Sequence, residues 1–370
     1  MKKLLGIILV VFCFISCISQ EVHSSLAEVT KINIPNLDGY VTLLCDFHTH
    51  TAYSDGRVLP TVRVEEAYFN GLDAVAITDH IEHRRWRKYK STSHNTSYQA
   101  ALTSPKAKDV IVIKGCEITR SMPPGHFNAF FISDTDALVQ ENYIDVFKTV
   151  KEQNGFLSWN HPGWKKHLLI GILFWWPEHT ALLEQGLMNG IEVVSGGKYS
   201  PDVHQWCIEN NLTILSGTDV HKQLKSYPPG KHRTMTLIFA KEKSTASIRE
   251  ALFDRRTAVY LKDLIIGEDK YLRQIFEKSL DISVLNTEDE ITQIKIKNNS
   301  GLIFELKRNE NIQGLTYLSN ARQNIYAIRP NSERTINVKI DTEIFEGEID
   351  FTVENFLVGP NIKMRYTLTP

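Results

Sequence analysis

Short apolar runs alternate with amphipathic stretches over more than half of the chain, and this alternation limits the possible folds more than any other feature. Candidate strands cover residues 41–47, 74–78, 110–118, 127–132, 155–159, 190–194, 212–216 and 234–239. Segments with helical periodicity lie between several of them, at residues 62–70, 144–154, 201–210 and 244–255. Strand, helix and strand in succession predict an α/β fold with a mostly parallel sheet, and about seven such repeats are enough to close a barrel.

The pattern changes after about residue 271. Short β-branched runs follow at residues 291–297, 302–306, 325–328, 335–340 and 351–358, separated by turn-forming clusters of Asn, Ser, Pro and Gly. They predict a small antiparallel β domain resembling a sandwich, preceded by a last helix at residues 271–278. We therefore expect a signal peptide at residues 1–20, an α/β domain at 38–268 and the β domain at 275–370.

The N-terminus has the features of an export signal. Lys2 and Lys3 precede an apolar run at residues 4–15, which is too short to span a bilayer as a helix. The segment at residues 14–17 resembles a bacterial lipobox and would make Cys17 the lipidated first residue; the alternative is ordinary cleavage near Ser16 or Ser19. We expect a periplasmic or outer-membrane-associated lipoprotein that contacts the membrane only through this lipid.

Charge and cysteine content exclude several classes of protein. Lys and Arg number 42 against 43 Asp and Glu, so the chain has no general attraction for nucleic acid. Beyond Cys17, Cys45, Cys116 and Cys207 are an odd number without close spacing, and they predict no disulfide framework. Cys45 and Cys116 end apolar runs and are expected to be buried strand residues.

Histidine and acidic residues gather at the ends of successive candidate strands. His48 and His50 are two apart, so an extended backbone turns both to one face. The whole set is His48, His50, Asp55, His80, Glu117, His126, His161, Asp219 and His221. The carboxyl ends of parallel strands meet at one rim, and imidazole with carboxylate suits zinc, manganese or iron. Nine donors exceed the needs of one ion, so we expect two or three divalent ions.

The other histidines lie in loops, polar stretches or near the signal segment, and a lone histidine is more often structural than a ligand. We interpret them as structural: His23, His83, His94, His167, His179, His204 and His232. Several tryptophans lie near an insertion after His161, together with an apolar stretch at residues 168–174. This insertion is either a packed helix or a lid whose aromatic rings could stack on a ligand.

Six short motifs carry a family resemblance: Asp46-Phe-His-Thr-His-Thr-Ala-Tyr-Ser-Asp-Gly56, Ile77-Thr-Asp-His80, Gly115-Cys-Glu-Ile118, Gly125-His126, Asn160-His-Pro162 and Gly217-Thr-Asp-Val-His221. As an ordered set over residues 40–265 they resemble the PHP (polymerase and histidinol phosphatase) family of metal-dependent phosphoesterases. The resemblance implies a distorted seven-stranded (β/α) barrel with a di- or trinuclear metal centre.

The resemblance also implies a role for each donor. His48, His50, Glu117 and Asp219 would hold a first ion. Glu117 would bridge to a second ion that His126 and His161 also hold, and Asp55, His80 and His221 would hold a third. Many members carry His where Asp55 stands, although Asp also occurs there.

The implied reaction is hydrolysis of a phosphate mono- or diester, either a small phosphorylated molecule or a phosphodiester. Clustered dications neutralise the ester oxygens and lower the pKa of a bound water towards about 7, which gives an attacking hydroxide. Glu117 and Asp219 are the expected catalytic carboxylates. Arg120, which is also a candidate catalytic residue, Lys231 and Arg233 are candidate phosphate clamps, because a guanidinium matches phosphate bidentately; the alternative is that they are solvated loop charges. Asp79 is expected to orient a ligand.

Two other functions compete with this interpretation. Amidohydrolase-type C–N hydrolases also begin with His-x-His on a barrel, but they generally bridge their ions with a Lys or carboxylated Lys. Lys114 is three residues from Glu117 and should face the opposite way in a strand. Alternatively, the chain is a binding lipoprotein whose β domain engages a glycan or protein; the complete donor set disfavours that class.

Overall fold

The structure is a computed structural model that describes residues 29–85, 93–224, 227, 231–286, 291–309, 312–318, 324–341, 343–345 and 347–368. The expected signal peptide at residues 1–20, with Cys17 as its expected lipidation site, lies outside these ranges. No helix within them is both long and apolar enough to cross a membrane.

The strands expected between residues 41 and 239 are all present, with ends that differ by one or two residues. They are β1 (Val41–Asp46), β2 (Ala74–Ile77), β3 (Ile111–Ile118), β4 (Phe127–Phe130), β5 (Phe156–Trp159), β6 (Gly190–Ser195), β8 (Thr213–Ser216) and β9 (Met235–Ala240). Most are buried along their whole length, which explains why they are continuous apolar runs in the sequence.

The expectation of a mostly parallel sheet is only partly correct. β1, β2 and β3 are parallel neighbours, and β5, β6 and β8 are another parallel group. β4 lies between the two groups and runs antiparallel to both β3 and β5, while β9 is antiparallel to β1. The short turn through Pro123, Pro124 and Gly125 leaves no room for the crossover helix that a parallel neighbour of β3 would need.

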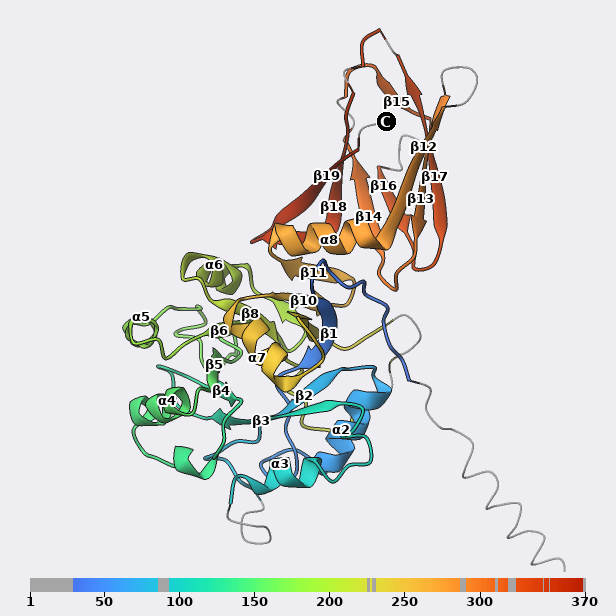
Figure 1. Cartoon of the computed structure of the whole chain (residues 1–370). Helices are drawn as coiled ribbons and strands as arrows, with labels where there is room; N and C mark the ends of the chain where they lie inside the picture. The colour runs from blue at the N-terminus through green and yellow to red at the C-terminus, as the bar shows by residue number, and fades with distance from the viewer. Residues whose placement is uncertain are drawn as a thin grey trace, which may run out of the picture.

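Helices cover the outside of these strands (Figure 1). They are α2 (Pro60–Phe69), α3 (Thr96–Ala101), α4 (Tyr143–Glu152), α5 (Pro177–Glu184), α6 (Pro201–Glu209) and α7 (Thr245–Phe253), with the short 3-10 helix η2 (Asp136–Leu138) before α4. The side chains of Asn142, Ser200 and Ser244 accept hydrogen bonds from the first turns of α4, α6 and α7, so three helix starts are fixed by capping residues.

β8 connects the two ends of this series of strands. On one side it pairs with β6, and on the other it lies beside β9 and β10 (Thr257–Leu261). Thr236 of β9 exchanges hydrogen bonds of 2.9 Å with the backbone N–H and carbonyl of Ser216. Thr257 of β10 donates to the Ile214 carbonyl at 3.0 Å. Threonine side chains therefore supply the contacts that a backbone ladder would make.

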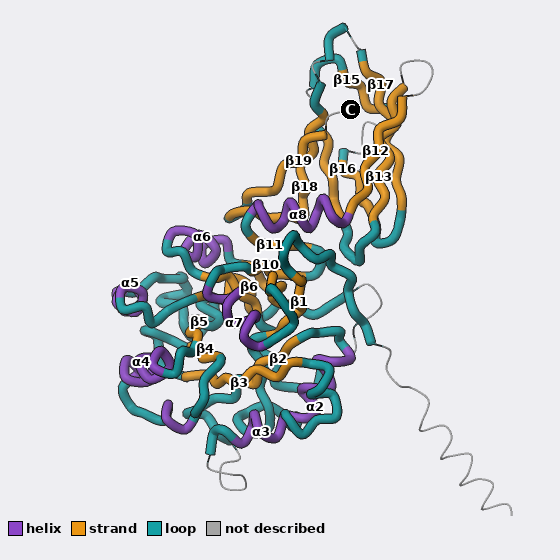
Figure 2. Tube along the Cα trace, in the orientation of Figure 1, coloured by secondary structure: helices purple, strands orange, loops and turns teal. Residues whose placement is uncertain are grey.

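The C-terminal part is the antiparallel β domain that the sequence predicts, and the expected last helix is α8 (Asp269–Ser279). Its strands are β12 (Leu280–Asn286), β13 (Ile291–Asn298), β14 (Phe304–Arg308), β15 (Leu315–Tyr317), β16 (Ile325–Ile328), β17 (Glu333–Ile340), β18 (Ile349–Gly359) and β19 (Ile362–Leu368). β12, β13, β17 and β15 form one sheet, and β16, β14, β18 and β19 face it (Figures 1 and 2).

The two parts share a sheet and a core. β11 (Leu264–Gly267) pairs in parallel with β18, so one 15-stranded mixed sheet runs from the α/β part into the β domain. α8 lies where the two parts meet and contacts both β11 and β18 (Figure 1). Leu44 of β1 and Phe304 of β14 belong to the same cluster of buried apolar side chains. This continuous contact fixes the β domain against the α/β part.

Candidate metal centre

The nine donors expected from the sequence lie at one rim of the α/β part. His48 and His50 directly follow β1, His161 follows β5, and Asp219 and His221 follow β8. His80 forms an isolated bridge with Glu117 near the end of β3. His126 directly precedes β4. Because β4 runs antiparallel, its first residue meets the last residues of its neighbours. His126, at the start of β4, thus lies at the same rim as the ends of β3 and β5.

Glu117 is the centre of the cluster, with a side chain that is only 1% exposed. Five imidazole nitrogens surround its two oxygens: His126 Nδ1 at 2.9 Å and His161 Nε2 at 3.4 Å from Oε1, and His50 Nε2 at 3.1 Å, His80 Nδ1 at 3.2 Å and His48 Nε2 at 3.3 Å from Oε2. One carboxylate oxygen therefore faces the residues expected at a second ion, and the other faces those expected at the first and third. This is the arrangement that a bridging ligand requires.

Asp219 and Asp55 complete the set on either side of His50. Asp219 Oδ1 is 3.1 Å from His50 Nε2 and 3.4 Å from His48 Nε2. Asp55 Oδ1 is 3.2 Å from His221 Nε2 and 3.6 Å from His80 Nε2. Donor atoms of His50, Asp55, His80 and His221 all lie within 4.8 Å of one another. His50 therefore adjoins both the first group of donors and the third.

Carboxylates control the charge of the cluster. Burial alone would lower the pKa of His48, but Glu192, Asp219 and Glu117 hold it well above its usual value. Burial would also lower the pKa of His50, but Asp219 and Glu117 raise it to about 9. Burial would raise the pKa of Asp55, yet His221, His80 and His50 lower it to about 2. The site thus favours bound positive charge, whether protons or metal ions.

Two buried nitrogens without a hydrogen bond show that the donors suit metal ions. Nδ1 of His50 and Nδ1 of His161 are buried, and neither has a hydrogen-bond partner among the described residues. A buried polar atom without a partner is costly, and imidazole with carboxylate is the donor set that zinc, manganese and iron accept. The residues present therefore fit divalent ions.

Glu192 in β6 supports the cluster, and the sequence analysis missed it. Its Oε1 lies 2.7 Å from His48 Nδ1, and its Oε2 accepts a hydrogen bond of 2.9 Å from the backbone N–H of His161. The first contact leaves Nε2 of His48 as the nitrogen that faces Glu117. A single glutamate within the apolar run of residues 190–194 was the available signal, because a buried charge requires a partner.

A second ionic contact holds the start of the first motif. Asp46 accepts hydrogen bonds from the His48 backbone N–H at 3.1 Å and from Thr218 Oγ1 at 2.6 Å. Arg233 forms a buried ion pair with Asp46. Arg233 is therefore a positioning residue beneath the donors and not a phosphate clamp, while Lys231 is exposed.

Asp79 has the orienting role that the sequence suggests. It accepts hydrogen bonds from the Thr51 backbone at 2.7 Å, from Thr51 Oγ1 at 2.6 Å and from Ser54 Oγ at 2.6 Å, and Ser97 also donates to it. These contacts fix the loop that carries Asp55. Asp79 itself is absent from the groups of clustered donor atoms.

Arg120 is not placed as a phosphate clamp. Its guanidinium forms an ion pair with Glu82 and donates to the backbone carbonyls of Thr119 at 3.0 Å and Gln140 at 2.8 Å. The Arg120 side chain therefore already neutralises Glu82 and connects two loops by hydrogen bonds. The location of Arg120 three residues after Glu117 in the sequence therefore did not predict the direction of its guanidinium group.

His167, which the sequence analysis interpreted as structural, lies beside two of the donors. One nitrogen each from His126, His161 and His167 lies within 4.8 Å of the others. The ring centroids of His167 and His126 are 4.7 Å apart. Burial, together with His126 and His161, lowers the pKa of His167 to about 3, which keeps its imidazole neutral. His94, His179 and His204 are outside these groups of donor atoms.

Two donors have an unusual backbone. His161 has φ of 33° and Asp219 has φ of 52°, in the left-handed region that favours glycine. Such conformations cost free energy and persist where surrounding contacts impose them, often at functional sites. Here the His161 N–H is held by Glu192, and the Asp219 N–H donates to the His48 carbonyl at 2.9 Å.

A cleft opens beside the donors. It has a volume of about 670 Å³, and its lining includes His161, Trp164, Lys165, Glu192, Lys198 and Asp219. His161 and Asp219 thus belong both to the donor cluster and to the cleft wall. Of the tryptophans expected around the insertion, Trp159 is fully buried and its ring stacks 3.8 Å from that of His179, which is a packing role. Trp164 is 39% exposed.

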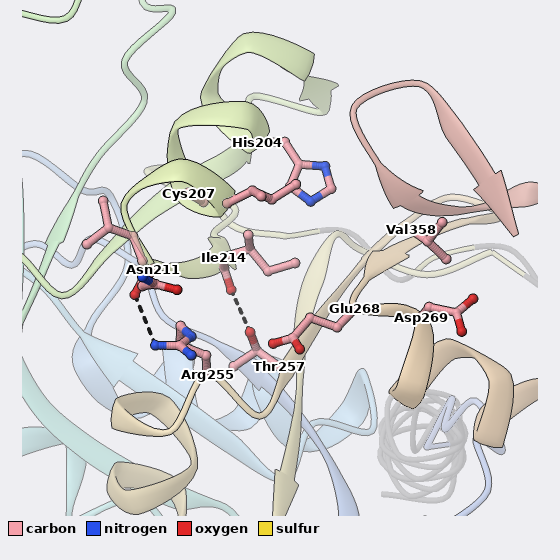
Figure 3. A pocket seen from close by; sticks show the side chains of 11 residues that line it. His204, Cys207, Asn211, Ile214, Arg255, Thr257, Glu268, Asp269 and Val358 are labelled. Carbon is pink, nitrogen blue, oxygen red and sulfur yellow. Dashed lines mark hydrogen bonds between the residues drawn. The ribbon is translucent and has the colours of Figure 1, made fainter.

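A separate cavity of about 390 Å³ lies near α6, β10 and the start of α8 (Figure 3). None of the nine donors lines it. Thr257 Oγ1 bonds to the Ile214 carbonyl, and Arg255 Nη1 donates to the Asn211 carbonyl at 3.3 Å, so its polar groups are engaged in holding strands and helices together (Figure 3).

Among the residues that the structure describes, no cysteine or lysine belongs to the cluster. Cys45, Cys116 and Cys207 are free and buried, the first two in strands as expected and the third in α6. The ammonium group of Lys114 binds the Ser133 carbonyl and lies 5.8 Å from the Tyr98 ring centroid. Lys114, the lysine nearest to Glu117 in the sequence, is therefore engaged away from the donors.

Comparison with known families decides the affiliation of this site. The PHP domain model matches residues 46–312, which include all nine donors. The chain belongs to the PHP domain family. A second model, of an Ig-like domain of the DUF5001 family, matches residues 280–369. The PHP resemblance and the C-terminal β domain predicted from the sequence are thus both confirmed.

Several solved structures and one curated sequence are similar to this chain. A two-domain protein from Bacteroides vulgatus, containing a predicted PHP-like metal-dependent phosphoesterase, is 41% identical with a TM-score of 0.86; the match covers 92% of this chain and 98% of that one. An amidohydrolase from Chromobacterium violaceum matches at 15% identity over 50% of this chain and 92% of its own, with a TM-score of 0.37. An uncharacterized protein from Methanocaldococcus jannaschii is 38% identical over 79 residues, 21% of this chain and 34% of that protein, so only about a third of that relative is matched.

Proposed function

We propose that this chain is a hydrolase of phosphoric ester bonds with a di- or trinuclear centre of zinc, manganese or iron. The observation that supports it most is the position of Glu117, whose two oxygens lie among five imidazole nitrogens. The first ion would be held by His48, His50, Glu117 and Asp219, the second by Glu117, His126 and His161, and the third by Asp55, His80 and His221. When bound, such ions neutralise ester oxygens and make a water molecule more acidic.

The protein's own residues perform the positioning. Glu192 orients the His48 ring and fixes the backbone of His161, while Arg233 and Asp46 hold the loop after β1 in place. Substrate would enter the 670 Å³ cleft and contact His161 and Asp219, which line it. Lys165 and Lys198 line that cleft, and we propose that they attract the phosphate in place of Arg120.

The proposal extends to architecture and location. The contacts of β8 with β6, β9 and β10 support closure of the strands into the distorted barrel expected for the family. The positively charged start and apolar run of residues 2–15 support export, with Cys17 as the lipidated residue. Phosphorylated small molecules or phosphodiesters outside the cytoplasm are then the substrates.

The test combines metal analysis with a substrate panel. The purified chain should contain at least two equivalents of divalent metal and hydrolyse phosphate mono- or diesters. Glu117→Gln keeps the side-chain volume but removes the bridging charge, so it should lose metal and reduce turnover at least ~100-fold. Glu250→Gln, at an exposed carboxylate, is the control. Full metal content with hydrolysis of amides alone would favour the amidohydrolase class, and metal-free protein that binds a glycan or protein would favour the binding class.

A further inference from the structure

The loop after β5 folds back onto the donor cluster. The Trp164 backbone N–H donates to the His161 carbonyl at 2.9 Å, and the His167 N–H donates to the Trp164 carbonyl at 2.7 Å. These two consecutive turns return the chain from His161 to the His126 ring. As a result, His167, six positions after His161, reaches the same group of donors as His161 itself.

The His167 side chain is buried and lacks a partner for one nitrogen. The residue is 6% exposed, and its Nδ1 has no hydrogen-bond partner among the described residues. One nitrogen each of His126 and His161 lies within 4.8 Å of a nitrogen of His167. A shared cation satisfies all three at once, because each ring offers it a lone pair.

We propose that His167 is a further metal ligand, which binds the ion held by Glu117, His126 and His161. This assignment rests on the metal centre of the proposed function and adds a fourth protein donor to a set of three. Four donors, with histidine nitrogen and carboxylate oxygen among them, are the number that zinc prefers. His167 is not one of the donors in the six motifs, so the ligand is a feature of this chain's own loop.

The bond between His167 and the ion would also hold the loop at residues 161–167 in place. Lys165 and Lys166 stand exposed between Trp164 and His167, and Lys165 lines the cleft. Anchored at His161 and at His167 by the same ion, this short segment, which lines the cleft from His161 to Lys165, is held at both ends. Metal binding thereby fixes a lysine and an exposed tryptophan where substrate would enter.

The experiment uses the full chain, stripped of metal by a chelator and titrated with Zn²⁺ alone. Zinc content per chain, calorimetric affinity and tryptic cleavage at Lys165 and Lys166 are measured. The unaltered protein should become resistant to cleavage on adding zinc. His167→Gln should weaken one zinc equivalent at least ~10-fold and abolish this protection, whereas His94→Gln, outside the cluster, should behave like the unaltered protein.

His167→Cys supplies a readout that a purely structural histidine would not give. A thiolate at this position binds Zn²⁺ and Co²⁺, so the Co²⁺-loaded variant should show a cobalt–thiolate absorption band that the unaltered protein lacks. Unchanged zinc affinity in His167→Gln together with no new band in His167→Cys would overturn the proposal and leave the metal-dependent hydrolase intact. Absence of zinc binding by the unaltered protein would instead refute the metal centre itself.

Discussion

Individual side chains in this site have more than one task, and Glu192 shows this most clearly. Each of its two oxygens contacts a different motif, one at the His48 ring and one at the His161 backbone. It therefore connects donors expected at two different ions without being a donor itself. A hydrogen-bonded carboxylate behind a histidine ligand fixes the ring and increases its basicity.

Glu192→Gln is predicted to weaken metal binding without unfolding the protein. The amide retains the shape of the side chain and can still accept one hydrogen bond, but it loses the charge that raises the pKa of His48. Metal affinity should fall roughly 10–100-fold. Calorimetric titration of metal-free protein measures it, and an unchanged thermal midpoint for the metal-free variant separates this effect from unfolding. Affinity equal to that of the unaltered chain would remove Glu192 from the site.

At the scale of elements, the end of β8 is packed directly against the end of β1. A Cβ at Gly217 would lie 2.2 Å from His48 Cβ and 2.8 Å from Glu192 Oε1. Both distances are shorter than any side chain tolerates, and His48 is itself fixed by Asp46 and Glu192. Glycine is thus required where the two strands bring their donors together.

Gly217→Ala is predicted to displace His48 and to lose metal. The added methyl group should also cost about 1–3 kcal/mol of stability through overpacking. Metal content and a chemical unfolding curve measure the two effects. Gly163→Ala is a matched control at the same rim, because a Cβ there meets nothing within 4 Å. Normal metal content in Gly217→Ala would show that the strand ends can separate without disturbing the donors.

α6 carries a histidine that should make stability depend on pH. His204 is 3% exposed, and burial lowers its pKa from 6.5 to about 4. Below pH 6.5 the unfolded chain binds a proton that native His204 does not bind, so stability is complete above pH 6.5 and falls as the pH decreases towards 4. The contribution is roughly 3 kcal/mol. His204→Gln should therefore be less sensitive to acid than the unaltered chain.

Urea unfolding of metal-free protein at pH 7, 6 and 5 tests this expectation. The stability difference between His204→Gln and the unaltered chain should shift in favour of the variant as the pH falls. Glutamine can still accept the hydrogen bond between Tyr199 Oη and His204 Nδ1, which is 2.8 Å long. Curves that remain parallel over this range would show that His204 does not govern the change.

The elements also show what the sequence could and could not predict. Strands such as β2 and β5 were found because they are buried apolar runs, and the donors were found because they end those runs. The direction of β4 was missed, since periodicity carries no orientation. β10 and β11 were missed because they follow α7 closely and lack turn signals of the expected kind. His167 could not be found, because its approach to His126 depends on two loop turns that spacing does not encode.

At the scale of the whole molecule, the β domain is joined to the metal-binding part by backbone pairing and by a common core. Ile265 of β11 lies opposite Phe356 of β18, and the Phe356 ring centroid is 5.4 Å from that of Phe304. All of these side chains are nearly inaccessible and belong to one cluster with Leu44 of β1. Loss of the β domain's packing should therefore reach the strands that hold the donors.

Phe356→Ala is predicted to destabilise both parts together, by about 3–5 kcal/mol. All six tryptophans precede residue 207, so tryptophan fluorescence reports unfolding of the metal-binding part alone. If the shared sheet makes unfolding cooperative, a substitution in β18 must lower the denaturant midpoint seen by those distant tryptophans. Ile362→Ala, at a side chain that is 59% exposed in β19, should leave the midpoint unchanged. If Phe356→Ala does not change the denaturant midpoint measured by tryptophan fluorescence, the two parts unfold independently despite the pairing of β11 with β18.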